Sequence, residues 1–362
     1  MKIVTIVGAR PQFIKAAVVS KAIDDYNETS SEKIEEKIIH TGQHFDENMS
    51  DIFFNQMKIR KPDYNLNIHS LSHGAMTGQM IESIEKILIN EQPDWLLVYG
   101  DTNSTLAGAL AAKKIHIKVA HVEAGLRSFN NRMPEEINRI LTDRVSDILF
   151  CPTYKAVQNL KSEGYDNIDA EVILIGDVMK DAALYYKDLS KNPLPNSLPE
   201  KYVLSTIHRA ENTDDINKLN DIFNALSQIS ETINIVIPLH PRTKKIIAKH
   251  NIKINDNIIF IDPVGYIQMV YLIDNCSLVM TDSGGLQKEA YFFQKPCITL
   301  REETEWVELL ENGYSVIVGS NQHKILEAFS KIEQNNFKLV EKEELYGKGD
   351  SGNKILEKLL IK

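Results

Sequence analysis

Short apolar runs rich in β-branched residues recur along this chain, and segments with a helical pattern separate them. In the first half the runs are KIVTIVG, EEKIIHTG, DWLLVYGD, KVAHVEAG and DILFCPT, and in the second half they are YVLSTIH, NIVIPLH, IIFIDP, LVMTDS, PCITL and SVIVG. Strands that are apolar throughout, without alternation, are typical of parallel sheets that helices cover on both faces. The sequence therefore predicts an α/β fold with doubly wound parallel sheets.

The length of 362 residues favours two domains. A boundary is indicated where SEGYDNIDAE is followed by a helical segment and then by the proline-bearing KNPLPNSLPE. We place it near Ala170, which predicts an N-terminal Rossmann-like domain over 1–170 and a C-terminal Rossmann-like domain over 171–362. The closing segment GNKILEKLLIK has the pattern of an amphipathic helix, which can pack on either domain.

The composition excludes several classes of protein. The formal net charge is -9, and no stretch concentrates Lys and Arg as a nucleic-acid face would. No apolar run approaches the roughly 18 residues of a membrane span, and the first residues lack a signal-peptide pattern. Cys151, Cys276 and Cys297 lie in or beside apolar runs, and no CxxC or HExxH pattern is present. We therefore expect reduced core cysteines, no metal site, no nucleic-acid or membrane partner, and a cytoplasmic location.

Polar residues follow most of the predicted strands. In chain order these positions are 8–12, 41–44, 100–102, 123–125, 208–209, 240–241, 281–285 and 301–303. In open α/β sheets, ligands bind beyond the carboxyl ends of the strands. A single polar residue at such a position is usually only a helix cap, but this many in register predict a ligand-binding cleft.

The segment TDSGGLQKEA joins a predicted strand to a predicted helix through Ser283, Gly284 and Gly285. Free N–H groups at a helix N-terminus suit a diphosphate. Glu289, one turn into the helix, can accept hydrogen bonds from both hydroxyls of a ribose. Alternatively, Ser283 only caps the helix, and Glu289 is only an acid of its first turn.

Basic side chains also stand at strand ends. Arg10 follows the first predicted strand and directly precedes Pro11. At this position it can bind a phosphate or be an ordinary surface cation. GxGxxG spacing is absent from the chain, so no nicotinamide cofactor is expected. His208 and His240 end two adjacent strands, where each can donate to a phosphate or move a proton. The alternative for both is a hydrogen-bonded structural histidine.

Three carboxylates are candidates for proton transfer. Asp101 ends the buried run WLLVYGD and can alternatively cap the helix that follows. Glu123 ends the buried run KVAHVEAG, and we expect it to face the cleft because an unpaired buried carboxylate is costly. Glu135 and Glu136 follow Pro134 at the start of a predicted helix, where the helix dipole alone favours acids.

These segments together resemble a known family. GARPQFIK, GDTNSTLAGALAA, HVEAGLRS with MPEEINR, HRAEN, and TDSGGLQKEA followed by LREETEW are similar to motifs of the non-hydrolysing UDP-N-acetylglucosamine 2-epimerases, in the family's order. The resemblance implies a GT-B fold with the active site in a cleft between two domains. It also implies an isomerase without a cofactor, and we expect a homodimer that makes precursors of bacterial surface polysaccharides.

The resemblance further implies roles for individual residues. The family's catalytic positions match Asp101, Glu123, Glu135 and His208. The positions that hold the UDP group match Arg10, His240, Ser283, Gly284, Gly285, Glu289 and Arg301, and Tyr266 matches a residue beside the uracil. A second, activating UDP-N-acetylglucosamine site of bacterial relatives matches Gln43, His44 and Arg209. The chain departs from the pattern of that second site, because Asp46 replaces a glutamine and the segment IHSLSHGAM lacks an arginine.

The implied reaction interconverts UDP-N-acetylglucosamine and UDP-N-acetylmannosamine. UDP leaves C1 with loss of the C2 proton, which gives a 2-acetamidoglucal, and UDP then adds back as a proton arrives from the opposite face. GARPQ instead of GTRPE, HRAENTDD instead of HRREN, and EETEWVE in the last motif resemble the branch that acts on UDP-2,3-diacetamido-2,3-dideoxyglucuronate or related UDP-deoxy amino sugars. A GT-B glycosyltransferase and a catalytically silent nucleotide-sugar sensor are further alternatives, but neither needs several carboxylates from the first domain.

Overall fold

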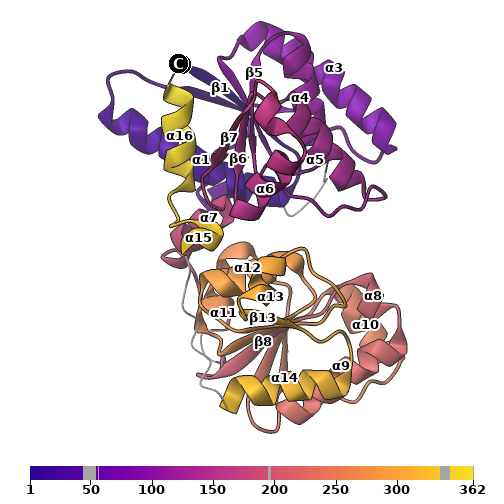
Figure 1. Ribbon diagram of the computed structural model, residues 1–362. Helices are drawn as coiled ribbons and strands as arrows, with labels where there is room; N and C mark the ends of the chain where they lie inside the picture. Colours follow the sequence, from indigo (N-terminus) through magenta and orange to yellow (C-terminus); the bar gives the residue numbers. More distant parts are fainter. Residues whose placement is uncertain (44–53, 56, 195–196, 335–342, 362) are drawn as a thin grey trace. The chain divides into compact units, whose positions relative to one another are not determined.

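The computed structural model describes residues 1–43, 54–55, 57–194, 197–334 and 343–361 (Figure 1). The chain divides into two compact units, of which unit 1 comprises Met1–Ala182 with Lys342–Lys362 and unit 2 comprises Ala183–Glu341. The passage from unit 1 to unit 2 lies within helix α7 (Val178–Lys187), beyond the boundary that the sequence suggests near Ala170.

Unit 1 is built on a seven-stranded sheet in which all described pairs of strands are parallel. Its strands are β1 (Lys2–Val7), β2 (Glu35–His40), β3 (Tyr64–Asn65), β4 (Trp95–Tyr99), β5 (Lys118–Val122), β6 (Ile148–Cys151) and β7 (Glu171–Leu174), in the order β3-β2-β1-β4-β5-β6-β7. The five central strands are the predicted ones. The sequence did not indicate the two edge strands, since β3 has only two residues and β7 is largely not buried.

Helices cover both faces of this sheet (Figure 1). They are α1 (Arg10–Thr29), α3 (His73–Glu91), α4 (Asn103–Lys114), α5 (Pro134–Val145), α6 (Tyr154–Ser162), the 3-10 helix η1 (Tyr165–Asn167), α15 (Glu343–Tyr346) and α16 (Ser351–Leu360), with the first part of α7. The last helix packs on the first, and Gly352 of α16 allows a close approach, because a Cβ there would lie 3.0 Å from the carbonyl oxygen of Val18. The C-terminal helix therefore belongs to unit 1.

Unit 2 is built on a six-stranded sheet, again with parallel neighbours among the described strands. Its strands are β8 (Tyr202–Thr206), β9 (Asn234–Pro238), β10 (Ile258–Ile261), β11 (Leu278–Thr281), β12 (Cys297–Thr299) and β13 (Ser315–Ile317), in the order β10-β9-β8-β11-β12-β13. Its helices are α8 (Ala210–Thr213), α9 (Ile216–Ile229), α10 (Pro241–Lys249), α11 (Tyr266–Asn275), α12 (Gly284–Phe292), α13 (Val307–Glu311) and α14 (Gln322–Gln334). The prediction of two doubly wound parallel sheets is confirmed.

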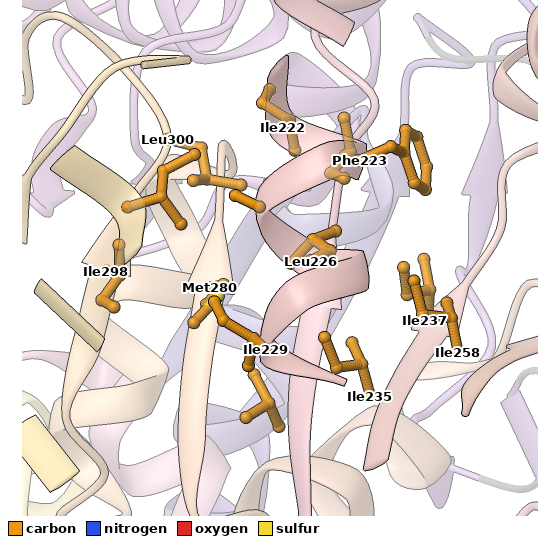
Figure 2. Close-up of a cluster of buried hydrophobic side chains, with 14 of the residues drawn as sticks. Ile222, Phe223, Leu226, Ile229, Ile235, Ile237, Ile258, Met280, Ile298 and Leu300 are labelled. Atoms are coloured by element: carbon orange, nitrogen blue, oxygen red, sulfur yellow. The ribbon is translucent and has the colours of Figure 1, made fainter. Parts of the chain in front are cut away.

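The core of unit 2 explains how α9 is held on the sheet. Ile222, Leu226 and Ile229 recur at helical spacing on α9, and all three are buried. They belong to one cluster with strand residues that include Ile235 and Met280 (Figure 2). Since removal of a buried Leu or Ile side chain typically costs about 2–5 kcal/mol, this cluster fixes the strands that carry the polar loop residues.

The three cysteines are buried and unpaired, as predicted. None of the described helices is long and apolar enough to cross a membrane. Within the same described ranges, no three His, Cys, Asp or Glu side chains are grouped as metal ligands.

Candidate functional site

Gln12 binds the ends of two central strands of unit 1 to each other. Its side-chain oxygen accepts hydrogen bonds from the backbone N–H groups of Gly8 and Ala9, at 2.8 and 3.1 Å. Its side-chain nitrogen donates to the carbonyl oxygen of Tyr99 at 2.7 Å and to the hydroxyl of Thr105 at 3.0 Å. The strand order reverses between β1 and β4, so this amide lies at the switch point where ligands of such sheets bind.

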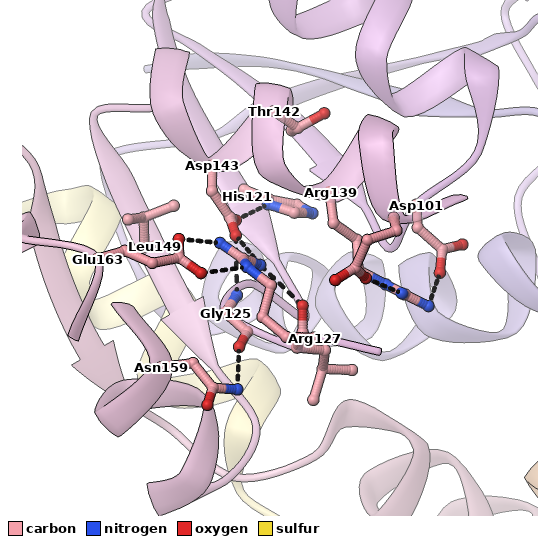
Figure 3. A network of polar contacts seen from close by, with 12 residues as sticks. Asp101, His121, Gly125, Arg127, Arg139, Thr142, Asp143, Leu149, Asn159 and Glu163 are labelled. Carbon is pink, nitrogen blue, oxygen red and sulfur yellow. Dashed lines mark hydrogen bonds and ion pairs between the residues drawn. The ribbon is translucent and has the colours of Figure 1, made fainter. Parts of the chain in front are cut away.

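Asp101 follows β4 and is held by α5. Nη2 of Arg139 donates to its carboxylate at 2.5 Å (Figure 3). Nδ2 of Asn138 donates to the backbone oxygen of Asp101 at 2.9 Å. The alternative role of capping α4 falls to Thr102, whose hydroxyl accepts a hydrogen bond from the N–H group of Thr105. The Asp101 side chain is 30% exposed, so its carboxylate is accessible to a ligand.

Glu123 follows β5 in the left-handed backbone region, with φ 72°. Residues with a side chain seldom adopt this conformation, and it is concentrated at functional sites. The Glu123 carboxylate pairs with Nζ of Lys15 from α1, and both side chains are largely buried. It lies beside the loop after β4, because a Cβ on Gly100 would be 3.2 Å from Oε2 of Glu123. The structure thus brings Glu123 close to the residue that precedes Asp101.

The two acids that open α5 have different surroundings. Glu136 is buried and accepts hydrogen bonds from the backbone N–H groups of Ser128 and Phe129, at 3.0 and 2.9 Å, and from Arg139 at 2.8 Å. Burial alone would raise the pKa of Glu136, but the N–H group of Ser128 and the Arg139 guanidinium lower it below its usual value. Glu136 anchors the preceding loop, whereas Glu135 is exposed, and its catalytic role stays a prediction.

Arg139 joins these acids electrostatically. Burial alone would lower the pKa of its guanidinium, but the nearby carboxylates of Asp101, Glu136 and Glu123 raise it above its usual value. Arg139 therefore carries a fixed positive charge among three carboxylates, two of which are predicted catalytic residues.

The residues predicted for a second nucleotide-sugar site are not assembled into one cluster within a unit. The side-chain oxygen of Gln43 accepts hydrogen bonds from the N–H group and the hydroxyl of Ser104, at 2.9 and 2.7 Å, in unit 1. Arg209 caps α8 in unit 2 and is partly buried. His44 and Asp46 lie outside the described residues. The second site stays a prediction.

In unit 2, Asp282 holds the loop that follows β8. Its buried carboxylate accepts hydrogen bonds from the backbone N–H groups of His208 and Arg209, at 3.0 Å each, and from Nδ2 of Asn212 at 3.2 Å. Nδ1 of the His208 ring lies 3.3 Å from Oδ1 of Asp282, while the side chain is 48% exposed. The imidazole is therefore fixed at one edge and open to a ligand at the other.

The N-terminus of α12 carries the features of an anion site. Ser283 caps the helix, since its hydroxyl accepts from the N–H group of Leu286 at 3.5 Å. A Cβ on Gly284 would collide with the carboxylate of Glu305, which pairs with Nη1 of Arg301 at 2.8 Å. In the described part of the chain, the buried Nε of Arg301 has no hydrogen-bond partner. A positive helix end and an incompletely bonded guanidinium both favour a bound anion.

The remaining predicted UDP contacts lie at the starts of helices. Gly285 is exposed in the first turn of α12, and Glu289 is buried in its second turn. His240 caps α10, because its Nδ1 accepts a hydrogen bond from the N–H group of Arg242 at 3.2 Å. That hydrogen bond is the structural role considered for His240, and it leaves Nε2 of the exposed ring for a ligand.

Tyr266 and Arg10 each open a helix. Tyr266 is the first residue of α11, where its ring meets that of Tyr186 edge-on with the ring centroids 5.5 Å apart. Arg10 is the first residue of α1 in unit 1 and is partly exposed. Their roles beside uracil and phosphate stay predictions.

Sequence reasoning missed three charged residues that contact the predicted ones, namely Lys15, Arg139 and Asp282. Asp282 stands inside the TDSGG segment. Lys15 and Arg139 lie in α1 and α5, where the helical pattern does not predict a contact with a residue on another helix or strand. With them, unit 1 presents two carboxylates, each beside a cation, which can accept and donate protons. Unit 2 presents a helix N-terminus, a guanidinium and two imidazoles, which suit a phosphorylated ligand.

Comparison with known proteins identifies the family. The family model described as UDP-N-acetylglucosamine 2-epimerase matches residues 27–360. A Pseudomonas aeruginosa protein, UDP-2,3-diacetamido-2,3-dideoxy-D-glucuronate 2-epimerase, is 52% identical over 361 residues, which are 99% of both chains. A Methanococcus maripaludis protein, named as a UDP-N-acetylglucosamine 2-epimerase homolog, is 52% identical over 373 residues and 99% of both chains.

The fold matches as well as the sequence. The crystal structure of Methanocaldococcus jannaschii UDP-GlcNAc 2-epimerase in complex with UDP-GlcNAc and UDP superposes with a TM-score of 0.82 and 42% identity over 99% of both chains. The match covers both parallel-sheet units and confirms the expected GT-B fold. The chain therefore belongs to the UDP-N-acetylglucosamine 2-epimerase family, and so to the isomerases that its motifs led us to expect.

Proposed function

We propose that this protein inverts C2 of a UDP-activated N-acetylated amino sugar by eliminating UDP and adding it back, without a cofactor. The observation that carries the proposal is the pair of carboxylates Asp101 and Glu123 at the ends of adjacent strands, each beside a cation. An epimerisation through a planar intermediate needs proton transfer on both faces of C2, and therefore at least two such groups. Glu135 completes the proposed set, and which acid serves which face is left to the experiment.

The chemistry follows from the substrate class. The C2 hydrogen of such a sugar is not acidic, but C1 carries UDP, a good leaving group. A carboxylate removes the C2 proton as the C1–O bond breaks, and the electron pair of the C2–H bond forms the double bond of a 2-acetamidoglucal. UDP then attacks C1 again while C2 takes a proton on the opposite face. No electron acceptor is needed.

Unit 2 supplies groups suited to retaining UDP through these steps. The N-terminus of α12 and the buried Nε of Arg301 favour the diphosphate, and Glu289 is proposed to accept hydrogen bonds from the ribose. His208 and His240 each present an exposed ring edge that can donate to a departing phosphate oxygen. Arg10 and Tyr266 are proposed to contact the phosphate and the uracil.

For the substrate itself we propose UDP-2,3-diacetamido-2,3-dideoxyglucuronate, with UDP-N-acetylglucosamine as the competing candidate. The P. aeruginosa relative named for the diacetamido uronate and the M. maripaludis UDP-N-acetylglucosamine 2-epimerase homolog are each 52% identical, whereas the M. jannaschii UDP-N-acetylglucosamine 2-epimerase is 42% identical. The support for the diacetamido uronate comes from the segments GARPQ, HRAENTDD and EETEWVE, which resemble the branch that acts on it. A homodimer in the cytoplasm remains the expected form.

The test is epimerisation in heavy water. Each UDP-sugar is incubated with the protein, and the products are analysed by NMR and mass spectrometry. We expect one deuterium at C2 per turnover, faster for the diacetamido uronate, and occasional release of the glucal. Protium retained at C2 after a single turnover would overturn the elimination route, and faster turnover of UDP-N-acetylglucosamine would overturn the substrate assignment.

Variants locate the proton transfer. Asp101→Asn and Glu123→Gln should each lower the rate of C2 exchange by at least the ~10²-fold typical of general acid–base groups, while UDP still binds. Glu82→Gln is a matched control, because it also neutralises a carboxylate that pairs with a lysine, Lys86, but on the exposed surface of α3. Near-normal exchange by both site variants would show that these acids are not the proton carriers.

A further inference from the structure

His121 contacts the backbone of the loop after β4, which carries Asp101, and it precedes the loop after β5, which carries Glu123; we call these two the catalytic loops. It belongs to β5, two residues before Glu123, and its side chain is fully buried. Figure 3 shows its ring beside the buried carboxylate of Asp143 from α5, and the other ring nitrogen lies against the backbone of Gly100, the residue before Asp101. Neither His121 nor Asp143 has a part in the proposed chemistry.

Both ring nitrogens of His121 face hydrogen-bond acceptors. Nε2 lies 2.7 Å from the carbonyl oxygen of Gly100, which can only accept, so Nε2 carries a hydrogen. Nδ1 lies 2.7 Å from Oδ1 of Asp143. Oδ2 of Asp143 accepts from Nη1 of Arg127 at 2.7 Å and from the N–H group of Gly125 at 3.2 Å. One hydrogen between Nδ1 and Oδ1 therefore joins the ring to a carboxyl group whose other oxygen is already bonded twice.

Arg127 bonds this pair from the other side. Its side chain is 1% exposed and pairs with Asp143, which is fully buried, and with Glu163, which is 33% exposed. Asp143 also acts on Cys151 and Tyr165, whose pKa values are raised by burial first and by Asp143 second. A buried charge network with this degree of pairing is rigid, since losing one partner leaves the other uncompensated.

The His121–Asp143 pair connects the backbones of both catalytic loops. Through His121 it holds the carbonyl of Gly100, the residue before Asp101, in a left-handed conformation with φ 65°. Through Oδ2 of Asp143 it holds the N–H group of Gly125, two residues after Glu123. One carboxylate thus sets the positions of both loops relative to each other.

We propose that His121 and Asp143 are positioning residues that fix the spacing between the Asp101 and Glu123 carboxylates. This inference rests on the proposed function, because the spacing matters only if Asp101 and Glu123 transfer protons on the two faces of C2. Misplacing a reacting group by about 1 Å can cost ~10²-fold in rate, so loss of the pair acts on turnover and not on UDP binding.

Two substitutions of His121 separate its two hydrogen bonds. The amide of Gln reaches the place of Nε2 and can still donate to Gly100, whereas the amide of Asn reaches only the place of Nδ1. We expect His121→Asn and Asp143→Asn to lower kcat for C2 deuterium exchange about 10²-fold with UDP affinity within twofold. His121→Gln should lose less, because it keeps the bond to Gly100 and loses only the one to Asp143. Glu163→Gln is the control for stability, because it weakens the bonding of the Arg127 side chain without removing a hydrogen bond to Gly100 or Gly125.

The wild-type ring supplies a readout that needs no activity. Nitrogen NMR of the histidines should show one ring whose Nε2 carries a hydrogen and whose Nδ1 is hydrogen-bonded to a carboxyl group, and the second feature should be absent from Asp143→Asn. An unprotonated Nε2 on His121 in the wild type would overturn the inference. Equal kcat for His121→Asn and wild type would do the same, as would a loss of kcat in Glu163→Gln as large as that in His121→Asn at the same Tm. Wild-type protein without any C2 exchange would instead refute the proposed function, and the catalytic purpose of the pair with it.

Discussion

Asp181→Asn should flatten the pH dependence of the stability of unit 1. Asp181 lies in α7, and its Oδ1 accepts the backbone N–H group of Gly352 at 2.9 Å, at the start of α16. Its Oδ2 is buried without a hydrogen-bond partner among the described residues. Burial, reinforced by the charges of Asp177 and Asp350, raises the pKa of Asp181 to about 6.

The sign and size of the effect follow from this pKa. Because the folded pKa of Asp181 exceeds the unfolded value near ~4, its contribution to stability is complete below about pH 4 and is lost as the pH rises through about 6. A shift of about two units corresponds to about 3 kcal/mol at ~1.36 kcal/mol per unit. Asn is neutral at every pH and keeps the acceptor for Gly352. Relative to the wild type, the free energy of unfolding of the variant should therefore rise by up to about 3 kcal/mol between pH 4 and pH 7.

Urea unfolding from pH 4 to pH 8 measures this difference. The chain has two tryptophans, Trp95 in unit 1 and Trp306 in unit 2, so a Trp306→Phe background lets fluorescence report unit 1 alone. Asp25→Asn is the control, because that side chain is 56% exposed and pairs with Lys21 on the surface of α1. A constant difference between Asp181→Asn and its background at every pH would refute the reasoning.

Three further substitutions test the strand ends. Gly100→Ala should cost roughly 1–2 kcal/mol of stability because of the left-handed φ, and should slow C2 exchange because the new Cβ crowds Glu123; urea unfolding and the exchange assay measure the two effects. Glu289→Ala should weaken UDP binding by roughly 1.5–3 kcal/mol in a calorimetric titration, and unchanged affinity would contradict a ribose contact. Gln12→Glu should lower the free energy of unfolding by roughly 1–3 kcal/mol, since a carboxylate cannot donate to the carbonyl of Tyr99. A midpoint of urea unfolding equal to that of the wild type would disprove this.

The strands and their polar ends could be predicted because each is encoded locally. An uninterrupted apolar run gives a buried parallel strand, and the residue after it emerges at the carboxyl edge of the sheet. This rule alone predicts the positions of Asp101 and Glu123 at that edge. It does not predict the edge strand β7, because an edge strand is only half covered and EVIL resembles a short loop or helix segment.

The partners of the predicted residues could not be derived in the same way. Lys15 and Glu123 are 108 positions apart, and Arg139 and Asp101 are 38 apart, so no local pattern joins them. Glu136 looked equivalent to Glu135, and only the loop that donates to Glu136 distinguishes the two. His121 sits within a buried strand run, where its polar ring carries no periodic signal.

The packing of α16 on α1 has a consequence for synthesis of the chain. Unit 2 comes from one continuous segment, whereas unit 1 needs residues from both sides of that segment. As the polypeptide leaves the ribosome, all of unit 2 emerges while α1 still lacks the helix that covers it. Unit 1 can therefore complete its packing only after unit 2 has emerged, although N-terminal parts generally mature first. A nascent chain stalled before residue 351 would expose the α1 face that α16 covers, and would be a natural client for chaperones.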